Sequence, residues 1–158
     1  MKYQTTTAQE TEQIGKKIAQ TLTGGAVVLL YGELGAGKTT LVKGIARALG
    51  VKEDITSPTF TLLNIYDIKT LKPQHQSKAR CGAQHKNIKT LVHIDTYRLE
   101  REQELIDIGV EDYLGSKNTV CVIEWPEKLT TILKSKKTIK VLMENIDKEK
   151  RKIIITNL

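Results

Sequence analysis

GELGAGKT, residues 32–39, matches the phosphate-binding pattern G-x-x-x-x-G-K-[ST] in full. The residues before it, 26–31, read AVVLLY and are typical of a buried strand. The residues after Lys38 carry apolar side chains at helical spacing, and the pattern stops at Gly50. A strand, a glycine-rich loop and a helix are the parts of a phosphate cradle. The sequence therefore predicts an α/β fold of the P-loop NTPase type.

The loop also indicates how a nucleotide would be held. Its glycines let the backbone approach phosphate oxygens, and the N–H groups at the helix start donate to them. Lys38 is expected to reach the β- and γ-phosphates, and the Thr39 hydroxyl is expected to ligate Mg²⁺. ATP and Mg²⁺ are therefore the predicted cofactors.

The rest of the chain predicts strands and helices around this unit. The last two strand-like runs are joined by a link too short for a parallel crossover, so we expect an antiparallel C-terminal hairpin. The prediction is a three-layer α/β/α arrangement with a mixed sheet. The expected helices cover residues 8–21, 99–108 and 127–133, and the expected strands cover residues 59–65, 90–94, 119–123, 138–143 and 152–156.

Composition is that of an ordinary globular protein. The 158 residues suffice for one domain, and 39% are hydrophobic and 27% charged. No apolar run reaches the roughly 20 residues that a membrane span needs. Two cysteines, Cys81 and Cys121, form no disulfide framework, so we expect a cytoplasmic protein, 1–158, with one P-loop domain.

The positive charge is concentrated in one segment. Residues 69–90 hold six of the 25 Lys and Arg residues and none of the 18 Asp and Glu residues. They lack apolar periodicity, so we expect a basic loop insertion at about 67–89. It is either a tolerated insertion or an electrostatic attractor for phosphates or an acidic partner. His75, Cys81 and His85 lie within it, but a structural zinc site needs four ligands at tighter spacing.

Two acidic residues follow apolar strands at the positions where α/β sheets bind ligands. Asp95 follows LVHI and Glu124 follows VCVI. A P-loop enzyme needs an acid at a neighbouring strand end to hold Mg²⁺, directly or through water. The sequence leaves open which of the two orients the attacking water.

Polar and aromatic residues beside these acids have two interpretations each. Ser57 and Thr59 supply hydroxyls to a loop that either faces the γ-phosphate as a switch segment or follows simple turn chemistry. Trp125, the single tryptophan, either packs against the sheet end or lies at the nucleotide.

Four motifs in this order, GELGAGKTT, SPTFTL, HIDTYRL and IEWPEKL, resemble the TsaE (YjeE) family. These are small bacterial ATPases of tRNA threonylcarbamoyladenosine synthesis. The resemblance implies TsaD-like and TsaB-like partners, which modify the adenosine beside the anticodon in tRNAs that read A-starting codons. It leaves open whether tRNA is reached indirectly or through the basic loop. Family members usually join SPTFTL to HIDTYRL by a short hairpin turn, whereas this chain has a much longer, basic connection.

The resemblance also implies roles for individual residues. Lys38, Asp95 and Glu124 would be catalytic, and Thr39 and Glu124 would hold Mg²⁺. Trp125 is the family aromatic beside the acid. The residues implied to bind the nucleotide are Thr7, Gly35, Ala36, Gly37, Lys38, Thr39, Thr40, Asp95 and Glu127.

Two rival functions are open at this point. A P-loop small-molecule or nucleoside kinase would need an acceptor pocket and usually a lid with arginines, and the chain has few arginines. A non-catalytic, nucleotide-dependent RNA-binding module would fit the basic segment. That segment, however, lacks the aromatic platforms on which single-stranded bases stack.

Overall fold

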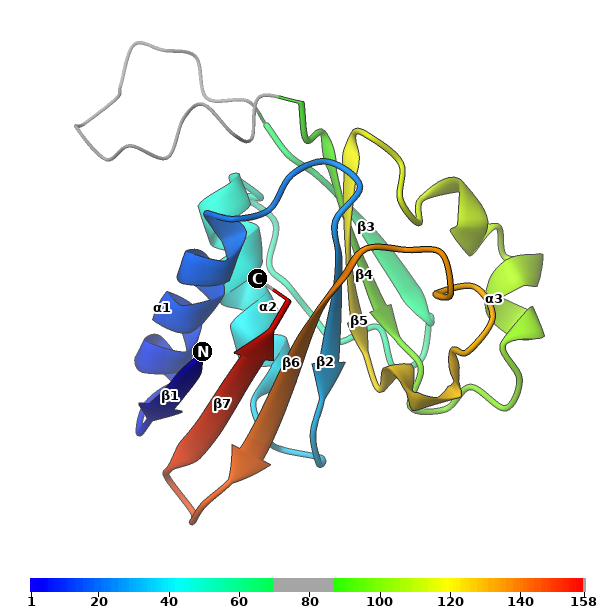
Figure 1. Ribbon diagram of the computed structural model, residues 1–158. Helices are drawn as coiled ribbons and strands as arrows, with labels where there is room; N and C mark the ends of the chain where they lie inside the picture. Colours follow the sequence, from blue (N-terminus) through cyan, green and yellow to red (C-terminus); the bar gives the residue numbers. More distant parts are fainter. Residues whose placement is uncertain (70–86, 158) are drawn as a thin grey trace, which may run out of the picture.

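A computed structural model describes residues 1–69 and 87–157 of the chain. In this part of the chain, seven strands form one mixed sheet in the order β1-β7-β6-β2-β5-β4-β3 (Figure 1). The neighbours β6, β2, β5 and β4 run parallel, whereas β3 and β7 pair antiparallel with β4 and β6. The strands are β1 (Lys2–Thr5), β2 (Val27–Tyr31), β3 (Leu63–Asp67), β4 (Thr90–Asp95), β5 (Thr119–Glu124), β6 (Thr138–Asn145) and β7 (Arg151–Thr156).

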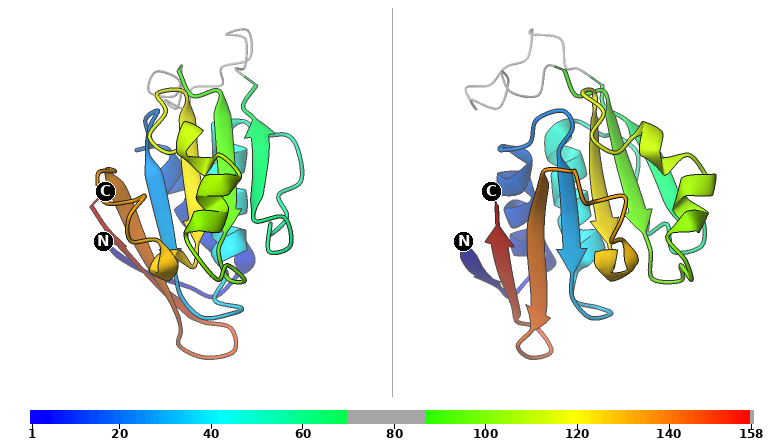
Figure 2. Two further views of the ribbon diagram at one scale, coloured as in Figure 1. Left: turned by 90° about the vertical axis from the view of Figure 1, so that its right-hand side faces the viewer. Right: turned by 45° about the vertical axis from the view of Figure 1, so that its right-hand side comes forward.

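Helices lie on both faces of the sheet (Figure 2). The long helices α1 (Ala8–Ala19) and α2 (Lys38–Leu49) cover one face, and the short α3 (Gln103–Asp107) lies on the other. Two 3-10 turns, η2 (Val110–Asp112) and η3 (Pro126–Lys128), complete the described elements. The mixed sheet, the layers and the antiparallel C-terminal hairpin confirm the predicted fold class.

The alternation of side chains along two central strands decides what faces α2. On β4, Val92 and Ile94 belong to the apolar cluster on the α3 side. Leu91 belongs to the cluster under α1 and α2. Because successive side chains point to opposite faces, His93 and Asp95 share the face of Leu91.

The strand β5 repeats this arrangement. Val120 and Val122 pack toward α2, while Cys121 and Ile123 pack toward α3. Glu124 is therefore on the α2 face, and in the parallel ladder it is the register partner of Asp95. Both acids consequently end neighbouring strands on the face where α2 begins.

The helices α1 and α2 pack with almost no space between them. A Cβ atom at Gly44 would overlap the backbone of Glu12, and one at Gly15 would overlap the carbonyl oxygen of Leu41. This close approach brings the first turn of α1 to the phosphate loop, where the Thr11 methyl group lies 3.9 Å from the position of a Cβ on Gly37. The hydroxyls of Thr5 and Thr11 join β1 to α1 across 3.0 Å in a buried position.

Three predicted segments were wrong in extent. The helix expected at 99–108 is only α3, because the Glu104 carboxylate accepts the backbone N–H groups of Glu100 and Arg101 before the helix begins. The helix expected at 127–133 is the turn η3, because the Glu102 carboxylate accepts the N–H groups of Thr131 and Ile132.

The strand expected at 59–65 starts only at Leu63. Residues 59–62 form a turn, in which Leu62 adopts a φ of 63°. The sequence also gave no sign of the edge strand β1. The predictions for most of the basic insertion, and for His75, Cys81 and His85, fall outside the described residues.

β3 ends and β4 begins at the end of the sheet opposite the phosphate loop (Figure 1). There, the N–H of Ile68 donates to the carbonyl of Lys89 across 2.8 Å. In residues 1–69 and 87–157, no helix has the length and apolar character to cross a membrane.

Candidate functional site

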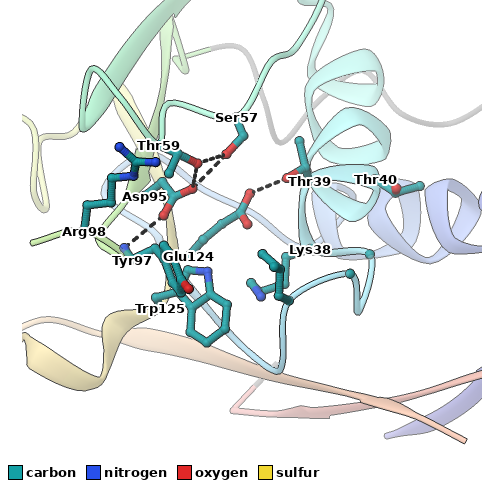
Figure 3. A pocket seen from close by; sticks show the side chains of 13 residues that line it. Lys38, Thr39, Thr40, Ser57, Thr59, Asp95, Tyr97, Arg98, Glu124 and Trp125 are labelled. Atoms are coloured by element: carbon teal, nitrogen blue, oxygen red, sulfur yellow. Dashed lines mark hydrogen bonds between the residues drawn. The ribbon is translucent and has the colours of Figure 1, made fainter.

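The phosphate loop and two carboxylates meet where β2, β4 and β5 end. The glycine-rich loop follows β2, Asp95 ends β4, and Glu124 ends β5. Together they line a cavity of about 580 Å³ (Figure 3). Its lining residues are Leu34, Gly35, Gly37, Lys38, Thr39, Thr40, Ser57, Thr59, Asp95, Tyr97, Arg98, Glu124 and Trp125.

The start of α2 is built to receive an anion. Gly37, the residue before the helix, has a φ of 96°, a conformation that glycine adopts without steric cost. The first turn of α2 has no acidic residue and no side-chain cap, so its N–H groups face the cavity without a competing carboxylate. Gly35 likewise has a positive φ, and a Cβ there would meet no atom within 4 Å.

Lys38 is a buried cation at the centre of this site. Its ammonium group donates to the carbonyl oxygens of Gly32, at 2.7 Å, and Glu33, at 2.9 Å. It also lies 3.7 Å from the centroid of the Trp125 ring. Burial lowers the pKa of Lys38, and the nearby carboxylates of Glu124, Asp95 and Glu127 oppose that shift.

Glu124 lies beside the residue that follows Lys38. One of its oxygens, Oε1, accepts the Thr39 hydroxyl across 3.0 Å, which joins β5 to α2 over 85 positions of sequence. The same oxygen lies 2.8 Å from Nε2 of His93. The side chain is 4% exposed, so the carboxylate is held nearly out of solvent.

Asp95 organises the opposite wall of the cavity. Its Oδ2 accepts the hydroxyls of Ser57, at 2.7 Å, and Thr59, at 2.6 Å, while its Oδ1 accepts the N–H of Tyr97 at 3.0 Å. The loop that carries Ser57 and Thr59 is therefore tied to the end of β4 (Figure 3). The two carboxylates thus have different surroundings: Glu124 contacts the P-loop helix, and Asp95 contacts the serine–threonine loop.

Trp125 has an unusual backbone conformation that turns its ring into the site. Its φ of 59° is in the left-handed region, which side chains with a Cβ rarely adopt. The hydroxyl of Thr96 stabilises this turn by donating to the carbonyls of Glu124 and Trp125. The indole ring packs on Tyr97 with centroids 5.0 Å apart.

Most residues selected from the sequence lie around one cavity. Lys38, Thr39, Thr40, Ser57, Thr59, Asp95, Glu124, Trp125 and the two glycines Gly35 and Gly37 line it.

Three other predicted residues are placed differently. Ala36 is fully buried and does not line the cavity. Thr7 is exposed and caps α1 by accepting the N–H of Glu10. Glu127 lies on η3, outside the cavity lining. Its negative charge opposes the lowering of the Lys38 pKa, and together with burial it raises the pKa of Tyr31.

Sequence reasoning did not select His93 or Tyr97. His93 stands two residues before Asp95 on the same strand, and period two places both on one face. This spacing could have predicted that His93 lies on the same face as the site acids. Tyr97 lies two residues after the end of β4, and nothing in its spacing distinguishes it from an ordinary exposed aromatic.

The residues present fit a divalent cation of the magnesium type. Mg²⁺ prefers oxygen ligands, and it is usually held by one or two protein oxygens together with phosphates and water. The Thr39 hydroxyl and the Glu124 carboxylate provide such oxygens 3.0 Å apart, at the edge of the phosphate cradle. These two side chains would hold the ion beside any phosphate group that Lys38 bound.

Comparison with known proteins gives one consistent result. The model of the family "Threonylcarbamoyl adenosine biosynthesis protein TsaE" matches residues 5–153. The chain is 40% identical to a Treponema pallidum TsaE over 126 residues, covering 80% of this chain and 78% of that protein. It is 31% identical to the Bacillus subtilis TsaE over 156 residues, covering 99% and 85%. The crystal structure of Bacillus subtilis YdiB superposes with a TM-score of 0.70 at 27% identity, covering 97% of this chain and 82% of that one.

Proposed function

The chain belongs to the TsaE family of threonylcarbamoyl adenosine biosynthesis proteins, and we propose that it binds and hydrolyses ATP with Mg²⁺ in support of TsaD-like and TsaB-like partners. In this proposal, the partners attach the threonylcarbamoyl group to the adenosine beside the anticodon of tRNAs that read A-starting codons. The observation that carries the ATPase proposal is the convergence of Lys38, Thr39, Asp95 and Glu124 on one cavity.

The P-loop side of the cavity would bind the nucleotide. The N–H groups of the loop and of the α2 start would donate to phosphate oxygens, and Lys38 would move from its carbonyl acceptors to the β- and γ-phosphates. Thr39 and Glu124 would hold Mg²⁺, which neutralises charge on the phosphates and polarises the γ-phosphate. These contacts are of the kind that phosphoryl transfer requires, namely positioning and charge stabilisation.

The opposite wall would position the attacking water. Asp95 holds the Ser57 and Thr59 hydroxyls at the cavity, and it does not contact Thr39. We therefore assign Glu124 to the metal and Asp95 to the water and the serine–threonine loop. In hydrolysis, the water oxygen bonds to the γ-phosphorus, the bond to the ADP oxygen breaks, and ADP and phosphate leave.

The mouth of the cavity supports a role in an assembly. Leu34 is 74% exposed and Tyr97 48% exposed, and both line the cavity. Phe60 is 82% exposed and stacks with Arg98, whose guanidinium lies 4.2 Å from the ring centroid. Exposed apolar side chains gathered at one opening favour coverage by another protein.

The test is ATP hydrolysis by the purified chain, alone and with TsaD-like and TsaB-like proteins, followed by separation of the labelled products. We expect Mg²⁺-dependent release of phosphate that rises when both partners are added. Lys38→Ala should lose about 100-fold or more of this turnover, because it removes the fixed cation at the transferred phosphate.

The same assay separates the proposed ATPase from the rival kinase. Transfer of the label to a small-molecule acceptor would identify a kinase instead. Normal hydrolysis by Lys38→Ala would contradict the P-loop assignment.

A further inference from the structure

His93 is a buried polar residue that the roles assigned above do not use. It lies on β4 with no exposed surface. One ring nitrogen, Nε2, is 2.8 Å from Oε1 of Glu124. The other, Nδ1, is buried without any hydrogen-bond partner among the residues that the structure describes.

This asymmetry decides which nitrogen carries the proton. A proton on Nδ1 would be a buried donor with no acceptor, whereas a bare Nδ1 leaves only an unused lone pair. The hydrogen bond to the Glu124 carboxylate needs a donor, and only Nε2 is in reach. The ring therefore donates to Glu124 from Nε2.

The hydrogen bond from His93 affects how the Glu124 carboxylate is held. Oε1 of Glu124 accepts two hydrogen bonds, one from His93 and one from Thr39. Its Oε2 has no hydrogen-bond partner in residues 1–69 and 87–157. The two hydrogen bonds to Oε1 thus fix the orientation of the Glu124 side chain and leave Oε2 free to bind a cation.

We propose that His93 is a positioning residue that turns Glu124 toward the Mg²⁺ site and thereby sets the affinity for Mg²⁺. The inference rests on the proposed function, because it assigns Glu124 to the metal. The positioning role is inferred from two observations, the 2.8 Å distance between Nε2 of His93 and Oε1 of Glu124 and the complete burial of His93. Outer partners of metal ligands act in this way, and their loss typically costs about 10- to 100-fold in metal affinity.

The alternative is that His93 only fills space between β4 and α2. Two substitutions of similar size separate the roles. His93→Leu keeps the volume and removes the donor. His93→Gln keeps a donor, because its amide nitrogen stands where Nε2 of the ring stands.

The experiment measures ADP binding by calorimetry as a function of Mg²⁺ concentration, together with ADP binding in EDTA and thermal melting. For His93→Leu, we expect the half-saturating Mg²⁺ concentration to rise about 10-fold or more, while affinity in EDTA changes less than about twofold. His93→Gln should stay within about threefold of the unmodified chain. In a Glu124→Gln background, His93→Leu should add no further shift.

Each contrary result has a distinct meaning. An unchanged Mg²⁺ dependence in His93→Leu would overturn the positioning role, and so would equal shifts in His93→Leu and His93→Gln. If His93→Leu does not fold, His93→Asn replaces it, since its amide reaches the place of Nδ1 and not that of Nε2. An unmodified chain whose ADP affinity ignores Mg²⁺ would instead contradict the proposed function itself.

Discussion

The ammonium group of Lys38 lies 3.7 Å from the centroid of the Trp125 ring, over its face. The predicted phosphate-binding cation and the single tryptophan of the chain are therefore in direct contact. Such cation–π contacts are worth roughly 0.5–2 kcal/mol, which is small beside a charge-assisted bond to phosphate. A phosphate at the P-loop can thus take Lys38 away from the ring.

This contact predicts an optical signal for nucleotide binding. When ADP binds, Lys38 should leave the indole face, and the emission of Trp125 should change and saturate with ADP concentration. Trp125→Phe is the control, because it removes the only tryptophan. If calorimetry detects ADP while the emission stays constant, Trp125 has a packing role only.

The lowered pKa of Lys38 predicts that ADP affinity depends on pH. Phosphate favours the charged ammonium, so the bound complex has a higher Lys38 pKa than the free protein, in which burial lowers it. ADP affinity is highest at pH values below the Lys38 pKa of the free protein. Above that pKa the affinity falls by up to about tenfold per pH unit, until the pH reaches the Lys38 pKa of the ADP complex. Calorimetric titrations from neutral to alkaline pH measure this slope.

Lys38→Arg is the matched control for that titration. Its guanidinium stays charged throughout, so its ADP affinity, whatever its absolute value, should be flat over the same pH range. A slope shared by the unmodified chain and Lys38→Arg would assign the titration to another group.

The different surroundings of the two carboxylates predict different kinetic defects. Asp95→Asn should lower kcat by about 10-fold or more with ADP affinity within about threefold, because it weakens the hold on water and on Ser57 and Thr59. Glu124→Gln should instead raise the Mg²⁺ concentration needed for half-maximal hydrolysis. Steady-state assays with saturating partners check both. Interchanged defects would reverse our assignment of the two acids.

Because α1 and α2 pack so closely, we expect a Gly→Ala substitution in α2, which normally stabilises a helix, to destabilise this protein. In an unobstructed helix, Gly→Ala stabilises by up to about 1 kcal/mol. At Gly44, the new Cβ would overlap the backbone of Glu12, so we expect Gly44→Ala to lower the free energy of unfolding by about 1–3 kcal/mol. Urea unfolding measures the change, with Lys43→Ala on the same helix as the control. A stabilised Gly44→Ala would show that the helices can move apart at little cost.

The parts of the site that sequence spacing controls were predictable. Lys38 and Thr39 occupy fixed places in a local motif. Asp95 and Glu124 follow apolar strands, and the carboxyl ends of parallel strands meet at one edge of a sheet. The predicted fold class, the C-terminal hairpin and the gathering of these residues all follow from such local rules.

Contacts between distant segments were not predictable. Nothing near Ser57 indicates that its hydroxyl binds a carboxylate 38 positions away. His93 was not predicted as a site residue because it lies within the apolar run before Asp95. A histidine in such a strand is indistinguishable from a core residue until its contact with Glu124 is known. The helix expected at 127–133 failed for a related reason, since Glu102, far along the chain, takes the N–H groups that a helix there would have used.

The predictions that concern the basic insertion stay predictions. They include its attraction to tRNA phosphates or to an acidic partner face. The strand ends that flank it, the end of β3 and the start of β4, lie at the end of the sheet away from the phosphate loop (Figure 1).

The single sheet combines strands from both sides of the basic insertion. A break between residues 69 and 87 would leave Lys38 and Thr39 in one fragment and Asp95 and Glu124 in the other. To rebuild the sheet, the fragments would have to restore four pairings: β1 with β7, β2 with β6, β2 with β5, and β3 with β4. ADP binding by a mixture of two separately expressed fragments would therefore report that the fragments had assembled.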